Sequence, residues 1–491
     1  MTIEQIIAKV KKNNPKADTD LIRLAYDFAE HAHGGQKRKS GEPYIVHPLY
    51  TAFLLAQMKA DLNTIAAGLL HDVPEDTEYD ITEIEKNFGQ EIAHLVEGIT
   101  KLGKIKYRGL ERYRENLRKM FLAMAADIRI VMIKFCDRLH NLMTLESLPR
   151  EKQERIARET LEIYVPIAEL LGMWSLKWQM EDICFKIIYP DEFKKIEYKY
   201  EVEKKAENNQ YIQRVKNILH EELKKSEVGH TTEGRFKHLY SIWLKMQEKN
   251  RRFDEIYDVF ALRVLVNNIS DCYKVLGIIH SIWKPKQGRF KDYVALPKPN
   301  GYRSLHTTVF GPEGKSVEFQ IRTEEMNDEA LYGIAAHWHY KRKFDKEKHE
   351  QPRWVEEILE IQKQITNTED FIKNVKFDVF QHRIFIFSPK GDVFELPEDA
   401  TPIDFAYAVH TEIGNKATGA VVNEEMGRLD QVLKNGDMVE IIIDKNRRGP
   451  NLSWLDFAKS KRAREKIKQC AVKYSLLKKF LNLGGQKKKR L

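Results

Sequence analysis

The sequence predicts a multidomain chain with an all-α N-terminal part, an α/β middle part and a small β-rich C-terminal module. Its 491 residues exceed the size of one compact domain, and about three domains fit this length. The hydrophobic pattern also changes along the chain, from helical spacing to the short runs that are typical of strands. Hydrophobic residues make up 42% of the chain and charged residues 32%, which suffices for buried cores and excludes a disordered or fibrous protein.

The first part of the chain, residues 1 to about 190, is expected to be helical. Apolar residues recur there three and four positions apart, as in the segment 21–28. Residues 1–14 alternate Ile and Val with Lys and Glu, so we expect an amphipathic helix and no signal peptide. Residues 191–230 are rich in Lys and Glu with few apolar positions, and we interpret them as solvated helices that join two domains.

Strands and turns set the later divisions. A continuous apolar run at 256–266 and an alternating run at 317–322 predict strands of an α/β domain. Turn residues at 389–391 and 435–437 separate further short strands. The expected divisions are a helical domain at 1–190, a helical linker at 191–230, an α/β domain at 231–341, a second linker at 342–375, a β-rich module at 376–445 and a basic helical tail at 446–491.

The net charge of +9 is concentrated at the C-terminal end. Residues 445–491 contain 16 Lys and Arg against two acids, a net of +14, so residues 1–444 carry a net of −5. Such a basic end suits an acidic partner, RNA first, although a solubilising tail or the cut end of a longer chain fits equally well. No apolar run approaches the roughly 18 residues of a membrane helix. The four cysteines are far apart, so we expect a cytoplasmic protein without disulfides or a cysteine zinc site.

Histidines and carboxylates at the ends of buried segments predict a metal site in the helical part. Polar side chains in such places would cost a few kcal/mol if they were buried without partners. Imidazole nitrogens together with carboxylate oxygens favour Mn, Fe or Zn over Mg or Ca. A metal there would lower the pKa of a bound water from 15.7 toward about 7. The candidate ligands are His47, His71, Asp72 and Asp137.

A proline shapes the chain after His71. The apolar run 65–70 predicts a buried helix that His71 should end. Pro74 cannot donate a backbone hydrogen bond and should push Val73 toward an extended conformation, so the helix is expected to end near Asp72. Glu75 and Asp76 would then lie on the next turn, where they could orient or deprotonate a water.

Each of these features has a simpler interpretation. The dipeptide His71-Asp72 alone is more often a helix cap than a metal site, and only the other candidate ligands favour the metal. The basic cluster 37–39 could hold a substrate phosphate or could be a solvated loop, and its composition leaves both open.

A basic loop predicts a second site in the α/β part. Residues 284–303 contain six basic residues and one acid, with Tyr293 and Tyr302 between them. This composition suits a surface that binds a polyphosphate and stacks an aromatic ring on a base. Glu318 and Asp258 lie on the two predicted strands, and two acids opposite a basic loop predict a Mg–nucleotide site. The loop alone would more often contact only RNA or solvent.

Strand alternation sharpens this second site. It places Val317, Phe319 and Ile321 on one face of the strand. Glu318, Gln320 and Arg322 fall on the other face. We therefore expect the second group to face the basic loop, unless its members simply face water.

Four long motifs resemble those of bifunctional Rel/SpoT-type (p)ppGpp synthetase/hydrolases of the bacterial stringent response. The resemblance covers residues from about 20 to 465. The motifs are GGQKRKSGEPYIVHP at 34–48, HDVPED at 71–76, GRFKHLYSIWLKM at 234–246 and PKPNGYRSLHTT at 297–308. The resemblance implies an all-α HD-type hydrolase domain, an α/β nucleotidyltransferase-like synthetase domain and a small β-grasp-like TGS domain.

The resemblance also implies an activity. Such a cytoplasmic enzyme transfers pyrophosphate from ATP to the 3′-hydroxyl of GDP or GTP and hydrolyses the (p)ppGpp product to GDP or GTP plus pyrophosphate. Because simultaneous operation would only consume ATP, we expect a conformational change through residues 140–235 to favour one site at a time. The alternative is a chain with one active site that serves mainly as a ribosome- or tRNA-binding regulator. The oligomeric state stays open.

Residue roles in the hydrolase domain follow from the same resemblance. It implies Mn²⁺ held by the four candidate ligands named above, with Glu75 and Asp76 activating the attacking water. Met143 stands where the family often has Arg, which leaves that substrate contact in question. The implied nucleotide contacts are Arg38, Lys39, Asn141 and Thr144.

Roles in the synthetase domain follow likewise. The resemblance implies Mg²⁺ bound by Asp258, with Glu318 as second ligand or as base for the 3′-hydroxyl, and Tyr302 stacked on guanine. Arg289 and Lys291 belong to an RxKD form that is typical of bifunctional members. The other implied nucleotide-binding residues are Arg235, Lys237, Lys245, Lys298, Asn300, His306, Gln320 and Arg322.

The C-terminal module resembles a TGS domain. In the family this module touches the 3′ end of uncharged tRNA on the ribosome, and the resemblance assigns that contact to His410. An ordinary loop histidine is the alternative. The sequence contains no match to the family's later helical, zinc-binding and ACT modules, and residues 446–491 resemble only the start of the next module. A piece of a longer chain and an unusually short member of the family both fit this pattern.

Overall fold

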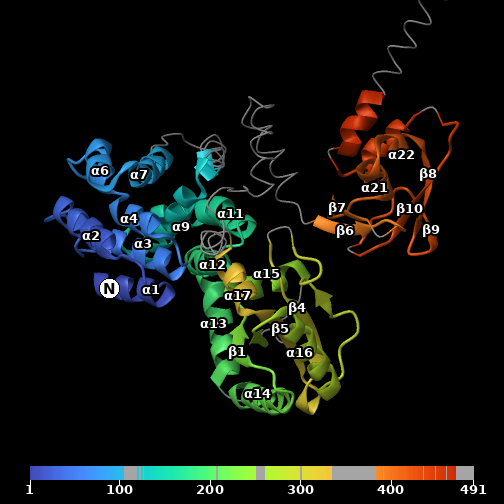
Figure 1. Cartoon of the computed structure of the whole chain (residues 1–491), viewed down its shortest axis with the longest axis horizontal. Coiled ribbons are helices and arrows are strands. Elements are labelled where there is room, and N and C mark those ends of the chain that lie inside the picture. Colours follow the sequence, from blue (N-terminus) through green and yellow to red (C-terminus); the bar gives the residue numbers. More distant parts are fainter. Residues whose placement is uncertain are drawn as a thin grey trace, which may run out of the picture. The chain divides into compact units, whose positions relative to one another are not determined.

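The structure, a computed structural model, confirms a chain built from a helical part, a mixed sheet with helices and a small β-rich module (Figure 1). It forms two compact units, Met1–Lys373 and Asn374–Leu491, which are described separately below. The finer domain boundaries remain predictions. The described residues are 1–103, 119–120, 123–124, 126–205, 208–249, 260–298, 301–333, 383–390, 392–434, 436–447, 449–460 and 462–470.

The N-terminal part is all helical, as expected. Its centre is α4 (Leu62–Leu70), whose side chains from Thr64 onward are all buried. The Asp61 carboxylate caps this helix by accepting from the Thr64 amide. The helices packed around α4 are α2 (Asp20–Ala32), α3 (Val46–Gln57), α7 (Gln90–Gly103) and α9 (Ile128–Met143).

The remaining helices of this part lie outside that centre. The predicted amphipathic helix at the N-terminus is confirmed as α1 (Ile3–Asn13), which buries Ile3, Ile6 and Val10. The other elements are α5 (Val73–Asp76), α6 (Ile81–Phe88), η1 (Leu145–Ser147), α10 (Arg150–Glu159), the π-helical η2 (Thr160–Tyr164), α11 (Val165–Leu170) and α12 (Trp174–Ile188).

The turn after α4 corrects one expectation. His71 caps α4, as predicted, but Val73 is not extended: it begins the single-turn helix α5. Pro74 lies at the start of α5, where the backbone N–H of a residue has no helical partner in any case. The chain therefore breaks between His71 and Val73 and resumes as a helix that carries Glu75 and Asp76.

The prediction that residues 191–230 form solvated helices is wrong. It consists of α13 (Pro190–Lys205) and α14 (Asn208–Lys225), and both helices bury apolar residues. Val215, Leu219 and Leu223 are four residues apart and form one apolar stripe, which joins the core of the sheet in the α/β part. The many charged residues on the other faces of these helices dominate the composition, so the composition did not reveal this stripe.

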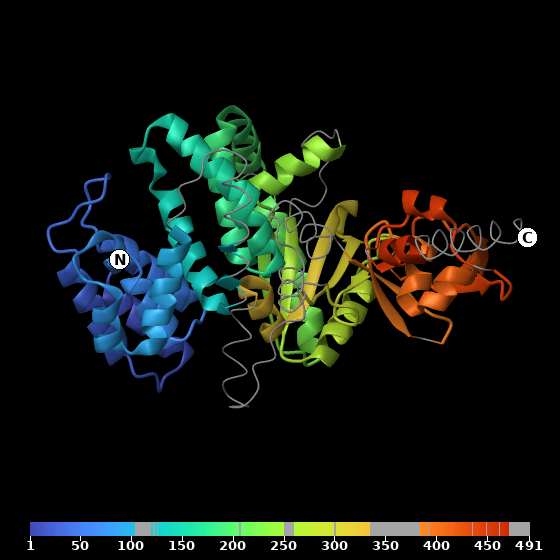
Figure 2. The same cartoon turned by 90° about the horizontal axis from the view of Figure 1, so that it is seen from above.

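The α/β part contains a five-stranded sheet in the order β1-β2-β5-β4-β3. Only β2 and β5 are parallel neighbours, and the other neighbours are antiparallel. Helices α14 and α16 cover one face (Figures 1 and 2). The elements are β1 (His230–Phe236), α15 (Leu239–Lys249), β2 (Phe260–Val266), α16 (Ile269–Ile282), β3 (Lys291–Asp292), β4 (Leu305–Phe310), η4 (Pro312–Gly314), β5 (Ser316–Thr323) and α17 (Glu324–Tyr332).

The alternation expected for β5 is confirmed. Val317, Phe319 and Ile321 are buried in the core under α16. Gln320 and Arg322, on the opposite face, are also nearly buried, at 3% and 2% exposure. This second face is therefore covered by protein and does not simply face water.

The second unit holds a three-stranded sheet in the order β10-β8-β9 and the hairpin β6-β7. Part of the expected basic tail is not a free tail, because Trp454, Ala458 and Ile467 pack in a core with Tyr407. Among the described residues no helix combines the length and the apolarity needed to cross a bilayer. The elements are β6 (Arg383–Phe387), β7 (Val393–Pro397), α21 (Pro402–Val409), α22 (Thr411–Lys416), β8 (Ala417–Val422), β9 (Glu425–Gly427), β10 (Val439–Ile443) and η5 (Leu452–Asp456).

Candidate active sites

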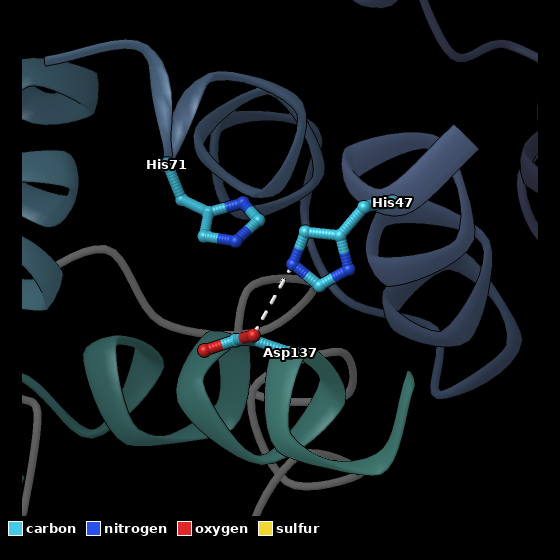
Figure 3. Close-up of side chains that lie close together, drawn as sticks. All are labelled: His47, His71 and Asp137. Carbon is cyan, nitrogen blue, oxygen red and sulfur yellow. Dashed lines mark ion pairs between the residues drawn. The ribbon is translucent and has the colours of Figure 1, made fainter. Parts of the chain in front are cut away.

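Three helices of the N-terminal part bring His47, His71 and Asp137 together (Figure 3). Each residue offers one ligand atom, and these atoms all lie within 4.8 Å of one another. His47 comes from α3, His71 from the end of α4 and Asp137 from α9. All three are buried. His47 Nε2 lies 3.2 Å from Asp137 Oδ1.

The hydrogen bonding of His71 suits a metal ligand. Its Nδ1 lies 2.8 Å from the Gly68 carbonyl oxygen, which can only accept, so Nδ1 carries the proton and donates. Its Nε2 therefore carries a lone pair, and this buried atom has no hydrogen-bond partner among the described residues. An unsatisfied buried lone pair beside a carboxylate is the arrangement that a bound cation resolves.

Asp72 lies at the rim of this cluster. Its carboxylate oxygens are 3.2 Å from His71 Nε2 and 3.4 Å from His47 Nε2. Burial by itself would raise the pKa of Asp72, but this pKa lies below the usual value, and the positive Lys134 contributes to the lowering. Three of the four predicted ligands, His47, His71 and Asp137, thus have their ligand atoms close together, and Asp72 as a fourth ligand stays a prediction.

Asp137 is held as an anion by its own helix. Lys134, one turn before it, donates to Oδ2 at 2.7 Å, and Asn141, one turn after it, donates to Oδ1. Burial opposes ionisation, yet the Lys134 ammonium holds the pKa of Asp137 well below its usual range. The pKa of Lys134 is raised in return, because Asp137 outweighs the effect of burial.

The acidic pair Glu75 and Asp76 is exposed next to this cluster. Desolvation of its carboxyl raises the pKa of Glu75, and the negative Asp72 and Asp76 raise it further against the opposing Lys134. The Tyr44 hydroxyl contacts Asp76 Oδ2 at 2.5 Å and Asp72 Oδ2 at 3.0 Å. It therefore links the predicted water-activating pair to the metal cluster.

The nucleotide contacts that were predicted for the helical part fall into two groups. Arg38 donates to His140 Nδ1 at 2.9 Å and to Asn141 Oδ1 at 2.7 Å. Lys39 is exposed, and the Thr144 hydroxyl donates to backbone carbonyls at the end of α9. Arg38 and Asn141 are thus joined to each other, whereas the structure gives Lys39 no such connection among the described residues.

Three residues of this site were not predicted from the sequence: Tyr44, Lys134 and His140. Their spacing carried a signal. Lys134 lies three residues before Asp137 and His140 three residues after it, so both share its side of the helix. Burial lowers the pKa of His140 to about 3, and Arg38 adds to this effect, so its imidazole is neutral.

In the five-stranded sheet, β4 and β5 bring several predicted residues onto one face. The register pairs His306 with Gln320 and Thr308 with Glu318. Gln320 Nε2 donates to Glu318 Oε1 at 3.1 Å, and His306 Nδ1 lies 3.8 Å from the same oxygen. The Tyr302 hydroxyl and His306 Nε2 form a hydrogen bond of 2.8 Å.

Cations and aromatic rings surround this face. The Lys298 ammonium lies 5.0 Å from the Tyr293 ring and 5.5 Å from the Tyr302 ring. The Arg322 guanidinium lies 5.9 Å from the Tyr302 ring. Arg289 and Lys291 are exposed at the β3 edge of the sheet, Lys237 follows β1, and Lys245 lies on α15.

Three predicted synthetase residues are not located by the structure. Asp258 and Asn300 lie outside the described residues, and of Arg235 only the backbone, in β1, is described. The approach of Asp258 to Glu318 therefore stays a prediction. Ala261, three residues after Asp258, pairs with Glu318 in the parallel register of β2 and β5.

His410 lies in the second unit between α21 and α22. It is exposed, and its Nδ1 accepts a hydrogen bond from the Glu412 amide at 3.2 Å, which caps α22. This capping explains the residue without a ligand, so the tRNA contact stays a prediction.

Three families match this sequence in order. They are described as "HD domain" at residues 25–174, "Region found in RelA / SpoT proteins" at 234–345 and "TGS domain" at 384–443. Together with the cluster of His47, His71 and Asp137, the HD match indicates a divalent-metal site in the helical part.

Curated relatives cover nearly the whole chain. "Bifunctional (p)ppGpp synthase/hydrolase SpoT" of Escherichia coli is 46% identical over 96% of this chain and 69% of its own length. "Guanosine-3′,5′-bis(diphosphate) 3′-pyrophosphohydrolase" of Aquifex aeolicus is 44% identical over 96% of this chain and 67% of its own length. "GTP pyrophosphokinase" of Streptomyces coelicolor is 45% identical over 95% of this chain, which spans only 57% of that relative.

Proposed function

The chain belongs to the Rel/SpoT family of (p)ppGpp synthetases and hydrolases, and on this basis we propose that it both makes and degrades (p)ppGpp. One site transfers the β,γ-pyrophosphate of ATP to the 3′-oxygen of GDP or GTP. The other removes that 3′-pyrophosphate by hydrolysis. The observation that carries the second half is the buried lone pair of His71 Nε2 beside His47 and Asp137.

The hydrolase site is proposed to hold Mn²⁺. The donor set of two imidazoles and two carboxylates, from His47, His71, Asp72 and Asp137, fits this ion. The cation would supply a water whose lowered pKa makes hydroxide available at neutral pH.

The acidic pair is proposed to handle the proton of the attacking water. Glu75, whose pKa is raised, is the better base of the two at neutral pH, and Asp76 orients the water. Tyr44 holds Asp76 in place, because its hydroxyl bonds to that carboxylate. The attack places oxygen on the phosphorus of the 3′-pyrophosphate, the bond to the ribose 3′-oxygen breaks, and a proton goes to that oxygen.

In the hydrolase site, the basic cluster 37–39 is proposed to bind the nucleotide. Arg38 and Lys39 would contact its phosphates, and Asn141 and Thr144 would line the guanosine pocket. Met143 is 38% exposed at the end of α9 and offers no hydrogen-bond donor, so any contact it makes with the substrate is apolar.

The synthetase site is proposed to act mainly by positioning and charge neutralisation. Tyr302 stacks on guanine, and Glu318 accepts the proton of the attacking 3′-hydroxyl. The 3′-oxygen then bonds to the β-phosphorus of ATP, and AMP leaves. Mg²⁺ bound by Asp258 would neutralise phosphate charge, and Glu318 is its second ligand if it does not act as the base. The cations proposed to bind ATP and the acceptor nucleotide are Arg235, Lys237, Lys245, Arg289, Lys291, Lys298 and Arg322, with Asn300, His306 and Gln320 as polar contacts.

Alternation between the two sites remains a prediction, for which the helices offer a physical route. The Asp182 carboxylate on α12 accepts from the Tyr240 amide on α15 at 2.9 Å. The Trp178 and His238 rings stack at 4.3 Å. The hydrolase helices thus contact the synthetase helix that carries Lys245. Undiminished hydrolysis with a nucleotide bound at the synthetase site would contradict alternation.

The TGS module and the basic end are proposed to contact the ribosome and uncharged tRNA in the cytoplasm. The support is the family membership and the excess of Lys and Arg at residues 445–491.

The test is a two-activity assay on the purified chain. Labelled ATP plus GDP and Mg²⁺ should yield ppGpp, and ppGpp plus Mn²⁺ should yield GDP and pyrophosphate. Asp258→Ala should abolish only synthesis, and Asp72→Ala only hydrolysis. A wild-type chain with one activity would support the single-site alternative. Loss of both activities from either change would indicate misfolding and would require milder variants at the same residues, Asp258→Asn and Asp72→Asn.

A further inference from the structure

We propose that Arg38 is a positioning residue of the metal centre, a role separate from any contact with the nucleotide. Its guanidinium holds His140 and Asn141. These two side chains contact the ligands His47 and Asp137. The inference rests on the metal site of the proposed function.

The hydrogen bond from Arg38 to His140 determines the tautomer of His47. A guanidinium can only donate, so His140 Nδ1, 2.9 Å from Arg38, must accept. His47 Nδ1 lies 2.7 Å from that same nitrogen. Two lone pairs cannot face each other at this distance, so the proton of the contact belongs to His47 Nδ1. His47 Nε2 then presents its lone pair to the cluster, as a metal ligand requires.

The hydrogen bond from Arg38 to Asn141 determines how Asn141 binds the carboxylate of Asp137. The amide oxygen of Asn141 accepts from Arg38 at 2.7 Å, and its Nδ2 donates to Asp137 Oδ1. Since Arg38 only donates and the ionised Asp137 only accepts, only this orientation of the amide satisfies both neighbours. Arg38 thus fixes the hydrogen bonding of His140, which contacts the ligand His47. It also fixes the hydrogen bonding of Asn141, which contacts the ligand Asp137.

The consequence of losing Arg38 follows from this pattern. His140 could then carry its proton on Nδ1 and donate to His47. The proton of His47 would move to Nε2, which lies 3.2 Å from Asp137 Oδ1. A proton bonded between these two ligands competes directly with a cation. His140 is 4% exposed, so water cannot easily replace the missing donor.

Electrostatics alone predicts the opposite result. Removing a positive charge near a cation site should strengthen cation binding, by an amount that depends on distance and exposure. Lys39, the residue directly after Arg38, carries the same charge and is exposed. Its replacement therefore reports the charge effect without the hydrogen bonds.

The experiment measures Mn²⁺ affinity of the purified full chain without nucleotide, by loss of the free-ion electron paramagnetic resonance signal. Arg38→Met and His140→Leu should weaken Mn²⁺ binding about 10- to 100-fold, the range for residues that orient metal ligands. His140→Asn should restore affinity to within about threefold, since its amide oxygen can accept where Nδ1 did. Lys39→Met should leave affinity unchanged or slightly higher. Thermal unfolding of each variant confirms that it is folded.

Three results overturn the proposal in distinguishable ways. If the wild-type chain binds no Mn²⁺, the metal site itself is wrong and the role of Arg38 falls with it. If the wild type binds but Arg38→Met binds equally well, the metal site stands and the positioning role is wrong. Equal losses in His140→Asn and His140→Leu would likewise contradict an acceptor role. Arg38 is only partly buried, so its variant keeps the test valid should His140→Leu not fold.

Discussion

Tyr44→Phe should slow hydrolysis while leaving synthesis intact. The Tyr44 hydroxyl bridges Asp76 and Asp72, and burial together with these two carboxylates raises the pKa of the phenol, so it stays a donor at every working pH. The ring itself stacks on His33 with 4.5 Å between centroids, a contact that phenylalanine keeps. The substitution therefore removes one proton donor and little packing.

The magnitude follows from the acceptor. A hydrogen bond to a charged group contributes about 1.5–3 kcal/mol. Asp76 is exposed, so water can replace part of the hydrogen-bond free energy in the variant. We therefore take the lower half of the range. At 1.36 kcal/mol per factor of ten, kcat for hydrolysis should fall about 10- to 40-fold. KM should change little, because Tyr44 is not among the proposed nucleotide contacts.

The assay is Mn²⁺-dependent release of pyrophosphate from ppGpp, with synthesis from ATP and GDP measured on the same preparation. Tyr79→Phe is the matched control: its ring packs on Phe28 in the same part, and its hydroxyl has no hydrogen bond among the described residues. A Tyr44→Phe chain that hydrolyses ppGpp at the wild-type rate would refute the role of the hydroxyl, as would an equal loss in the control.

Three further predictions concern stability. Gly333 has φ +58°, and an added Cβ would lie 2.0 Å from the Leu171 carbonyl oxygen. Gly333→Ala should therefore lower the free energy of unfolding by at least about 2 kcal/mol in denaturant titrations. An unchanged midpoint would contradict this prediction. Burial raises the pKa of Asp182 to about 6, so its carboxyl favours folding below about pH 4 and this contribution is lost as the pH rises through 6. Asp182→Asn should reduce the loss of stability between pH 4 and 7 by about 1–2 kcal/mol, and parallel pH profiles of the two chains would argue against it. Mn²⁺ at about 100 times its Kd should raise the free energy of unfolding of the helical part by about 2.7 kcal/mol, an effect that chelator reverses and that Asp137→Ala should lack.

Secondary structure was readable wherever the apolar spacing was strong. The run from Ile65 to Leu70 predicted a buried helix that ends at His71, and α4 has this form. The failures occurred where composition hid the spacing. In α14 the buried positions are separated by charged residues, so the segment looked solvated although its apolar stripe enters the core. At Val73 the local effect of the following proline was overestimated, because a helix can begin there.

The sequence by itself determined which residue types could bind a metal and a polyphosphate, since long motifs place them at the ends of buried segments. It could not show that His47 and Asp137 meet, because they are 90 residues apart and only the packing of α3 on α9 joins them. Nor could it reveal Arg38 reaching His140, a contact between side chains that are 102 residues apart. Hydrogen-bond direction, and with it the tautomer of a ligand, depends on which donors surround an atom in space, and spacing along the chain carries no record of that.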